Sequence, residues 1–289
     1  MPPTPATPST PSSPADPPSR TPLSSARVVS ALRAAGCVFA EDEAELILAT
    51  ARCAEEAASM VDRRVAGLPL EQVLGWARFH GLRITVETGV FVPRRRTEFL
   101  VDQALAAAPE AGVVVDLCCG SGALGAALAA ALDGAEVHAA DIDPAAVRCA
   151  RRNLAAVGGR AHQGDLYDAL PAGLRGRVDV LTANVPYVPT AEVPLLPAEA
   201  RDHEPLVALD GGADGLDVLR RVAAGAHEWL APGGCLLTET GEHQAAAAGE
   251  VLTRAGLTTR LAVSEELYAH VLIGVRPRTG VRPRTGVRP

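Results

Sequence analysis

The 289-residue chain contains no lysine, and all 27 of its basic residues are arginine. Together with the excess of alanine, glycine and proline, this pattern is typical of coding bias, so arginine richness alone has no functional weight. The formal net charge of -7 argues against nucleic acid as the main partner, because nucleic-acid-binding proteins usually carry a basic patch or stripe. Aromatic residues make up only 3% of the chain, which leaves few rings on which bases could stack.

Cysteine motifs and long apolar runs are also missing. The six cysteines form no CxxC pair and no zinc-like ligand spacing, which argues against a disulfide framework and predicts no metal site. No segment has the uninterrupted apolar length of a membrane span, and residues 1–22 lack the apolar core of a signal peptide. We therefore expect a reduced, cytoplasmic protein with no membrane partner.

What is present divides the chain into five parts. They are a disordered Pro/Ser/Thr-rich tail (1–22), a helical domain (23–75), a β-hairpin linker (76–96), an α/β domain (97–275) and a basic low-complexity tail (276–289). In the linker, alternating and branched residues at 82–86 and 90–92 predict two strands. In the α/β domain strands alternate with helices, which predicts a doubly wound, mostly parallel sheet flanked by helices. The predicted strands include 112–116, 136–141, 178–183, 235–239 and 267–275.

A glycine-rich loop follows the first of these strands. Asp116 closes the strand, and Cys118 and Cys119 lead into a Gly-Ser-Gly sequence, whose glycines let the backbone approach a ligand closely. The string from Gly120 to Gly125 also satisfies G-x-G-x-x-G, the fingerprint of nicotinamide and flavin enzymes. In those sites the first glycine comes directly at the end of the strand, whereas here it comes four residues after the aspartate. D-L-x-x-G-x-G is instead typical of S-adenosylmethionine-dependent methyltransferases.

Two further carboxylates follow strands. Asp141, which precedes Ile142, ends the second strand, where a carboxylate can accept hydrogen bonds from both hydroxyls of a ribose. Asp165, which precedes Leu166, follows a third strand, and its carboxylate could accept from an adenine amino group. Asp143 is interpreted as the N-cap of the helix that begins one residue later. Each aspartate alone fits a capping or surface role, but the ordered set is much more specific than any member.

A turn whose residues could take part in a reaction follows the strand at 178–183. Its four residues are Asn184-Val185-Pro186-Tyr187, placed at a strand's carboxyl end, where open α/β sheets carry their chemistry. A planar amine or amide nitrogen is a poor nucleophile because its lone pair is delocalised. The side-chain oxygen of Asn184 and the carbonyl of Val185 could accept both of its protons and draw it towards tetrahedral geometry. In isolation, an asparagine followed two residues later by proline is usually only a turn.

Taken in order, these motifs resemble those of the protein-(glutamine-N5) methyltransferase family, class I enzymes that modify peptide-chain release factors. The resemblance covers about residues 23–275. It also rests on Gln72–Gly75, Phe79–Leu82, Val92–Arg94, Thr97–Glu98, Glu204–Pro205, Ala208–Leu209, Gly211–Gly212, Asp214–Leu216, Pro232–Gly234, Glu239, Gly241 and Gln244.

The resemblance implies a fold, a reaction and a set of site residues. The fold is a seven-stranded class I methyltransferase domain preceded by a small helical substrate-recognition domain. The implied reaction is methylation of the glutamine in the Gly-Gly-Gln loop of a release factor, with S-adenosylmethionine as cofactor, by a cytoplasmic monomer acting in translation termination. The implied catalytic residues are Asn184, Val185, Pro186 and Tyr187. The implied cofactor-binding residues are Asp116, Cys118, Gly120, Gly122, Asp141, Ile142, Asp165, Leu166 and Asn184.

Three departures from the family pattern indicate a divergent branch. Val185 replaces the first proline of Asn-Pro-Pro-Tyr, which keeps the main-chain carbonyl but lowers the rigidity of the turn. Arg95 and Arg96 stand where the family commonly has a proline and a variable, often acidic residue. Cys118 and Cys119 replace a Gly-Thr pair, and we interpret both thiols as small packing residues. The arginine run from 94 to 96 is usually a solvated face, yet it could steer a substrate loop or an RNA phosphate.

Other functions remain open on the sequence. The same Asn-x-Pro-Tyr logic would serve an adenine-N6 methyltransferase acting on RNA or DNA, although the acidic balance and low aromatic content count against it. A non-catalytic protein that keeps the cofactor pocket is favoured only by the departure at Val185. A nicotinamide-dependent oxidoreductase leaves the turn at Asn184 unexplained.

Overall fold

The computed structural model describes residues 24–278, and these fall into two compact units that divide between Asp62 and Arg63. The predicted tail at 1–22 lies outside the described residues, as does most of the tail at 276–289. The first unit contains α1 (Ser25–Ala34), α2 (Ala40–Thr50) and the start of α3 (Ala54–Val65). Its core follows helical spacing: Val28 and Leu32 on α1, four residues apart, are both fully buried.

In the second unit, the end of α3 is followed by a short helix and a hairpin. These are α4 (Leu70–Leu74), β1 (Trp76–Phe79) and β2 (Leu82–Thr85), and the two strands pair antiparallel. The predicted strand at 90–92 is wrong, and the first strand of the hairpin comes earlier than expected. Gly75 ends α4 in the left-handed conformation, so the chain turns directly into β1. Val90 and Val92 are buried in irregular chain whose backbone groups bond to the side chains of Gln72 and Glu204.

A seven-stranded sheet forms the centre of this unit. Its strands are β3 (Val113–Leu117), β4 (Glu136–Asp141), β5 (Arg160–Gln163), β6 (Val178–Ala183), β7 (Leu230–Glu239), β8 (Thr258–Ser264) and β9 (Ala269–Val275). Their order is β5-β4-β3-β6-β7-β9-β8, parallel up to β7, with β9 antiparallel to both of its neighbours. The doubly wound α/β prediction is confirmed, whereas β8 was not expected and β7 begins earlier than the predicted 235–239.

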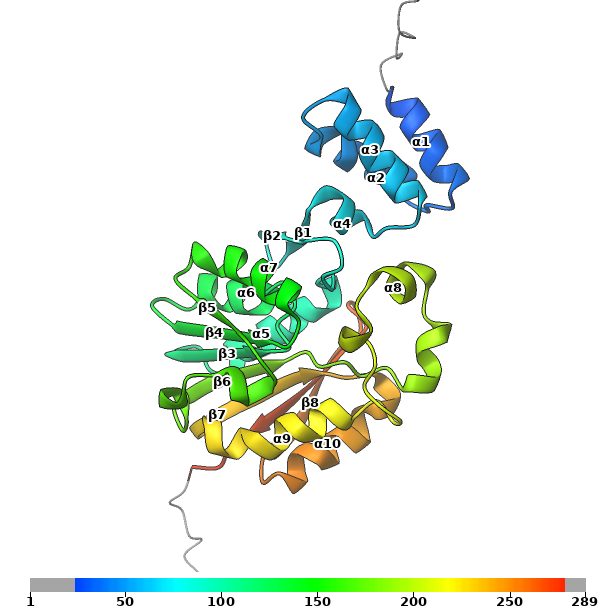
Figure 1. Ribbon diagram of the computed structural model, residues 1–289. Coiled ribbons are helices and arrows are strands. Elements are labelled where there is room, and N and C mark those ends of the chain that lie inside the picture. The colour runs from blue at the N-terminus through cyan, green and yellow to red at the C-terminus, as the bar shows by residue number, and fades with distance from the viewer. Residues whose placement is uncertain (1–23, 279–289) are drawn as a thin grey trace, which may run out of the picture. The chain divides into compact units, whose positions relative to one another are not determined.

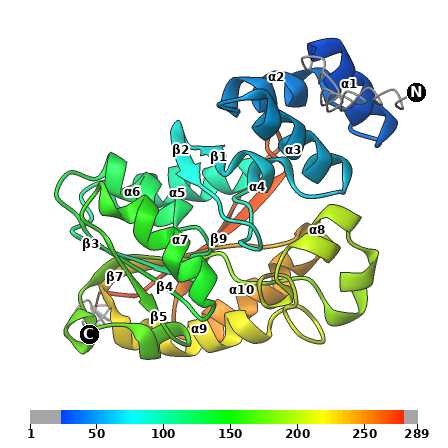
Figure 2. The ribbon, with the colours of Figure 1, turned by 45° about the horizontal axis from the view of Figure 1, so that its top comes forward.

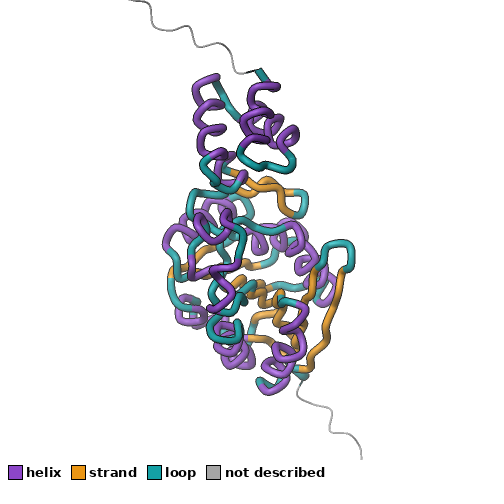
Figure 3. The backbone as a smooth tube through the Cα atoms, turned by 90° about the vertical axis from the view of Figure 1, so that its right-hand side faces the viewer, coloured by secondary structure: helices purple, strands orange, loops and turns teal. Residues whose placement is uncertain are grey.

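Helices cover both faces of the sheet (Figures 1 and 3). One layer contains α5 (Glu98–Ala107), α6 (Ala123–Ala131) and α7 (Pro144–Ala155), and the other contains α9 (Asp217–Trp229) and α10 (Ala245–Arg254). On β3, Val114 packs in the first layer while Val113 and Val115 pack in the second. This alternation explains why the strand reads as an unbroken apolar run: both of its faces are buried.

The strand order places two loops side by side. From β3 the chain proceeds to β4 and β5 on one side of the sheet and then returns to β6 on the other side of β3. Leu117 and Ala183, the last residues of β3 and β6, are direct neighbours in the parallel register. The segments after these strands, the glycine loop and the Asn184 turn, therefore meet at the switch point where open α/β sheets bind ligands.

A long excursion separates β6 from α9, and Figure 2 shows it in yellow-green around α8. It comprises η4 (Thr190–Leu195), α8 (Ala198–His203) and η5 (Leu206–Ala208). The remaining short 3-10 turns are η1 (Arg95–Thr97), η2 (Leu166–Ala169), η3 (Ala172–Leu174) and η6 (Glu242–Gln244). Across residues 24–278, no helix has the length and apolarity that crossing a membrane requires.

Candidate active site

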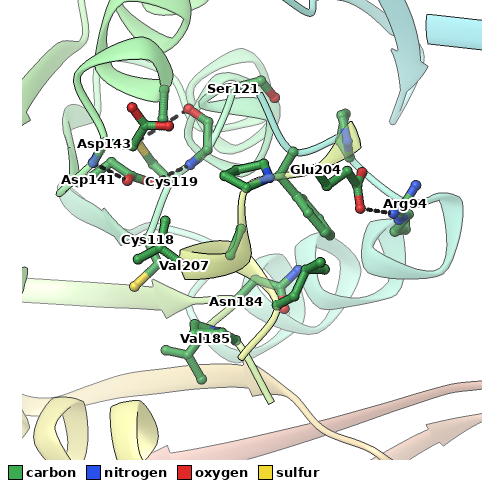
Figure 4. Close-up of a pocket in the computed structure, with 18 of the residues that line it drawn as sticks. Arg94, Cys118, Cys119, Ser121, Asp141, Asp143, Asn184, Val185, Glu204 and Val207 are labelled. Atoms are coloured by element: carbon green, nitrogen blue, oxygen red, sulfur yellow. Dashed lines mark hydrogen bonds and ion pairs between the residues drawn. The ribbon is translucent and has the colours of Figure 1, made fainter. Parts of the chain in front are cut away.

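A cavity of about 650 Å³ opens at the carboxyl ends of the central strands. It is lined by ten predicted site residues: Cys118, Gly120, Asp141, Ile142, Asp165, Leu166, Asn184, Val185, Pro186 and Tyr187. Figure 4 places Asp141, Asp143 and the two cysteines on one side of the cavity and Arg94 with Glu204 on the other. Of the predicted site residues, all of which are described, Asp116 and Gly122 lie outside the lining.

Asp116 does not line the cavity but holds together the elements that carry the site. Its side chain is fully buried, and its two carboxylate oxygens accept hydrogen bonds from the Thr182 hydroxyl at 2.9 Å and the Gly125 backbone N–H at 3.1 Å. It therefore joins β3 to β6 and to the first turn of α6. Burial raises the pKa of Asp116 to about 7, against the lowering effect of these two hydrogen bonds.

The glycine loop is held in shape by Asp141. One of its carboxylate oxygens accepts from the Gly120 backbone N–H at 2.9 Å, and the other accepts from the Asp143 backbone N–H at 2.9 Å. Gly122 has a φ of +76°, and a Cβ there would come within 2.9 Å of the Ala150 side chain. A side chain at this position would thus force the loop away from α7. The predicted N-cap is confirmed, since the Asp143 carboxylate accepts from the Ala145 N–H at 2.8 Å.

The surroundings of the two cysteines in this loop disfavour the thiolate form. Burial raises the pKa of both the Cys118 and the Cys119 thiols, and the negative charges of nearby aspartates add to the effect. A protonated thiol reacts slowly, so the structure fits the interpretation of these thiols as packing residues. Cys118 adopts a φ of +53°, a conformation that favours glycine.

Asp165 has a partner that the sequence did not reveal. Its carboxylate accepts from the Arg221 guanidinium at 2.7 Å, and both side chains are about half exposed. Arg221 comes from α9 and also lines the cavity. The pair places a cation beside the carboxylate that we expect to face adenine.

The Asn184 turn is fixed through its backbone. The Gln244 amide donates at 2.9 Å to the Tyr187 carbonyl and, also at 2.9 Å, to the Asp214 carbonyl. Gly215 approaches the same Tyr187 carbonyl so closely that a Cβ would lie only 2.2 Å from it. The side-chain amide of Asn184, in contrast, has no hydrogen-bond partner among residues 24–278, which leaves its oxygen available to a ligand.

Two buried glutamates, Glu204 and Glu239, also line the cavity. Glu204 accepts from the Val92 backbone N–H at 3.1 Å and pairs with Arg94, as the dashed line in Figure 4 shows. Glu239, at the end of β7, pairs with Arg96. All four residues belong to the family resemblance or to its departures, but none of them was among the predicted site residues. The signal for Glu239 was its position, because it ends a parallel strand next to β6.

The arginine run at 94–96 differs from its expected role as a solvated face. Arg94 and Arg96 both reach buried carboxylates, whereas Arg95 is exposed and has no ion pair among the described residues.

The described part of the chain holds no group of three or more His, Cys, Asp or Glu side chains arranged for a metal ion.

Sequence comparison finds close relatives. Residues 81–195 match the model of the methyltransferase small domain. The release factor glutamine methyltransferase of Geobacter sulfurreducens is 40% identical over 199 residues, covering 68% of this chain and 69% of the relative. That of Bradyrhizobium diazoefficiens is 37% identical over 232 residues, covering 77% and 78%. A 4-amino-L-phenylalanine/4-methylamino-L-phenylalanine methyltransferase of Streptomyces pristinaespiralis is 39% identical over 193 residues, covering 64% and 65%.

Solved structures agree on the fold. A methyltransferase from Pyrococcus furiosus superposes with a TM-score of 0.52 at 18% identity, covering 68% of this chain and 90% of that one. The T. thermophilus 16S rRNA N2 G1207 methyltransferase, solved with AdoMet and guanosine, gives 0.50 at 23% identity, covering 70% and 49%. At these identities the likeness establishes the methyltransferase fold and nothing finer.

Proposed function

Because this chain belongs to the family of release factor glutamine methyltransferases, we propose that it methylates the side-chain nitrogen of a glutamine in a peptide-chain release factor, using S-adenosylmethionine. The observation that carries this proposal is the Asn184 turn. Asn184 and Val185 line a cavity that is also lined by the glycine loop, and the Asn184 amide has no hydrogen-bond partner among residues 24–278. The helical segment at 23–75 is proposed to recognise the protein substrate.

The residues around the cavity fit the cofactor. Carboxylates at Asp141 and Asp165 suit the ribose hydroxyls and the adenine amino group, and half-exposed Ile142 adds an apolar side chain to the same cavity lining. The acidic lining on this side suits a ligand that carries positive charge on both its sulfonium and its ammonium groups. When bound, S-adenosylmethionine would supply an electrophilic methyl group.

The chain's own contribution is alignment and polarisation of the acceptor. The Asn184 oxygen and the Val185 carbonyl accept the two N–H groups of a glutamine amide, which directs its nitrogen lone pair towards the glycine loop. Val185 is only 3% exposed and packs in the core between the sheet and α9. Its carbonyl therefore stays fixed although valine leaves φ freer than proline would.

A second candidate substrate has one observation in its favour. The relative from Streptomyces pristinaespiralis acts on 4-amino-L-phenylalanine, an aromatic amine whose nitrogen lone pair is also delocalised. The same pair of acceptors would orient such a nitrogen. Methylation of a small aromatic amine is therefore the alternative, whereas no comparable observation favours adenine in a nucleic acid.

The test measures transfer of labelled methyl groups from S-adenosylmethionine to unmethylated release factor, and in parallel to 4-amino-L-phenylalanine. Peptide mass spectrometry would locate the product at the glutamine of the Gly-Gly-Gln loop. Asn184→Ala is the matched control, because it removes the free acceptor and leaves the turn's backbone bonds. Labelling of the glutamine by the wild type alone supports the proposal. Labelling of the amine alone would replace it with the second candidate.

A further inference from the structure

The hydroxyl of Tyr187 lies between two charged side chains. The Arg96 guanidinium donates to it at 2.6 Å, and the hydroxyl donates to the Glu239 carboxylate at 3.0 Å. Arg96 also donates directly to the same carboxylate oxygen at 2.7 Å, so each of the three side chains is hydrogen-bonded to the other two. The second carboxylate oxygen accepts from the Thr97 hydroxyl at 2.6 Å. We call Arg96, Tyr187 and Glu239 the tyrosine clamp.

The clamp joins three separate parts of the chain at the cavity wall. Arg96 belongs to η1, Tyr187 to the turn after β6, and Glu239 to the end of β7, and all three line the cavity. Glu239 is almost fully buried, with 3% of its side chain exposed, while 45% of the Arg96 side chain is exposed. A buried carboxylate needs compensating partners, and the clamp and Thr97 supply them.

We propose that Arg96 and Glu239 are positioning residues that hold the ring of Tyr187 as a fixed wall of the slot in which the planar acceptor group lies. This inference rests on the proposed function, since it assumes that the acceptor binds at Asn184. Rotation of the tyrosine side chain would break hydrogen bonds to both a cation and an anion, which are among the stronger bonds in proteins. The phenol is thereby held at both its donor and its acceptor side.

The same geometry excludes two other roles for Tyr187. Burial and the nearby Glu239 charge raise the pKa of Tyr187, so the hydroxyl stays protonated and does not act as a base. Its only proton already goes to Glu239, so it cannot donate to the acceptor without breaking the clamp. What it offers is the flat face of its ring. Because Val185 does not lock the turn as a proline would, the clamp adds a restraint at the side-chain end of Tyr187.

A double-mutant cycle tests this inference. Arg96→Ala and Tyr187→Phe each break the clamp, and we expect each to lower kcat about tenfold, with KM for S-adenosylmethionine unchanged. The double variant should be no slower than Tyr187→Phe alone, because Arg96 acts through the hydroxyl. Arg95→Ala is the matched control for loss of an adjacent, exposed arginine. Additive losses, or full activity of Arg96→Ala, would overturn the inference.

A spectroscopic arm does not depend on the substrate. The chain has three tyrosines, so labelling with 3-fluorotyrosine gives three ¹⁹F signals, and Tyr187→Phe assigns the relevant one. Arg96→Ala and Glu239→Gln should shift and broaden that signal, and Arg95→Ala should not. An unchanged signal in Arg96→Ala would overturn the clamp. If wild-type protein methylates neither test substrate while these shifts occur, the proposed function fails and the clamp itself stands.

Discussion

The carboxylate of Asp116 and the hydroxyl of Thr182 lie 2.9 Å apart and are both fully buried, one on β3 and one on β6. This bond joins the two strands whose following segments make the candidate site. It lies beneath the cavity and outside its lining. Asp116 therefore supports the segments that form the site, and its role in cofactor binding stays a prediction.

The first prediction concerns the pH dependence of stability. The folded-state pKa of Asp116 is raised by burial from 3.8 to about 7, so between these values the folded protein holds a proton that the unfolded chain releases. Its contribution to stability is fully present below pH 3.8 and is lost as the pH rises through about 7. We expect the free energy of unfolding of wild type minus that of Asp116→Asn to fall over this window, as measured by urea denaturation. A difference that does not vary with pH would contradict the prediction.

The second prediction concerns the close approach of the glycine loop to α7. Gly122→Ala places a methyl group 2.9 Å from the Ala150 side chain at a φ of +76°, so we expect a loss of about 2 kcal/mol in stability and weaker binding of S-adenosylmethionine. Gly134→Ala is a matched control, because it has a similar φ of +71° but open space around the new methyl group. Thermal unfolding and calorimetry check both variants. If Gly122→Ala and Gly134→Ala change stability and cofactor binding equally, backbone strain alone explains the loss, and the contact with Ala150 does not contribute.

The sequence predicted those elements whose residues form a clear local pattern of apolar and polar side chains. The apolar runs at β3 and β6 are buried on both faces, and the polar residues that end them fall at the switch point. β8 was missed because it lies at the sheet edge, where all of its residues are exposed or half-exposed and the apolar signal is weak.

The wall of the site made by Arg94, Glu204, Arg96 and Glu239 could not be foreseen in the same way. Arg94 and Glu204 lie 110 residues apart in the chain, and Arg96 and Glu239 lie 143 apart. No periodicity reports such a distant pairing. A run of three arginines therefore suggested a solvated face until the fold brought two buried carboxylates to it.

The third prediction concerns the adenine end of the cavity. Asp165→Ala removes the carboxylate expected to accept from the adenine amino group, and we expect the Kd for S-adenosylmethionine to rise about tenfold, as one charge-assisted hydrogen bond is lost. Arg221→Ala should raise it less, because Arg221 only orients the carboxylate through their 2.7 Å contact. Arg220→Ala is the control, since that neighbour pairs with Asp214 and Asp217 and does not line the cavity. If calorimetry shows that Arg220→Ala raises the Kd for S-adenosylmethionine as much as Asp165→Ala does, the assignment of Asp165 is wrong.

The fourth prediction separates catalysis from cofactor binding through Gln244. This amide donates to the carbonyls of Tyr187 and Asp214, so Gln244→Ala frees the turn that carries Asn184 without touching the glycine loop. We expect kcat to fall about tenfold, because small displacements of the acceptor contacts weaken alignment, while the Kd for S-adenosylmethionine stays within about twofold. Gln244→Glu should be slower still, since it replaces the donor with a carboxylate that faces two carbonyl oxygens and repels them.

Gln103→Ala serves as the control for this last prediction, because Gln103 bonds Arg260 on the surface, away from the cavity. Single-turnover methylation and calorimetry on the same samples distinguish the possible results. Loss of cofactor binding in Gln244→Ala would mean that the turn and the glycine loop move as one body. Unchanged kcat would mean that Gly211 and Gly215, which pack against the backbone of the turn, hold it without help. Only a fall in kcat with binding preserved assigns Gln244 to the positioning of the acceptor.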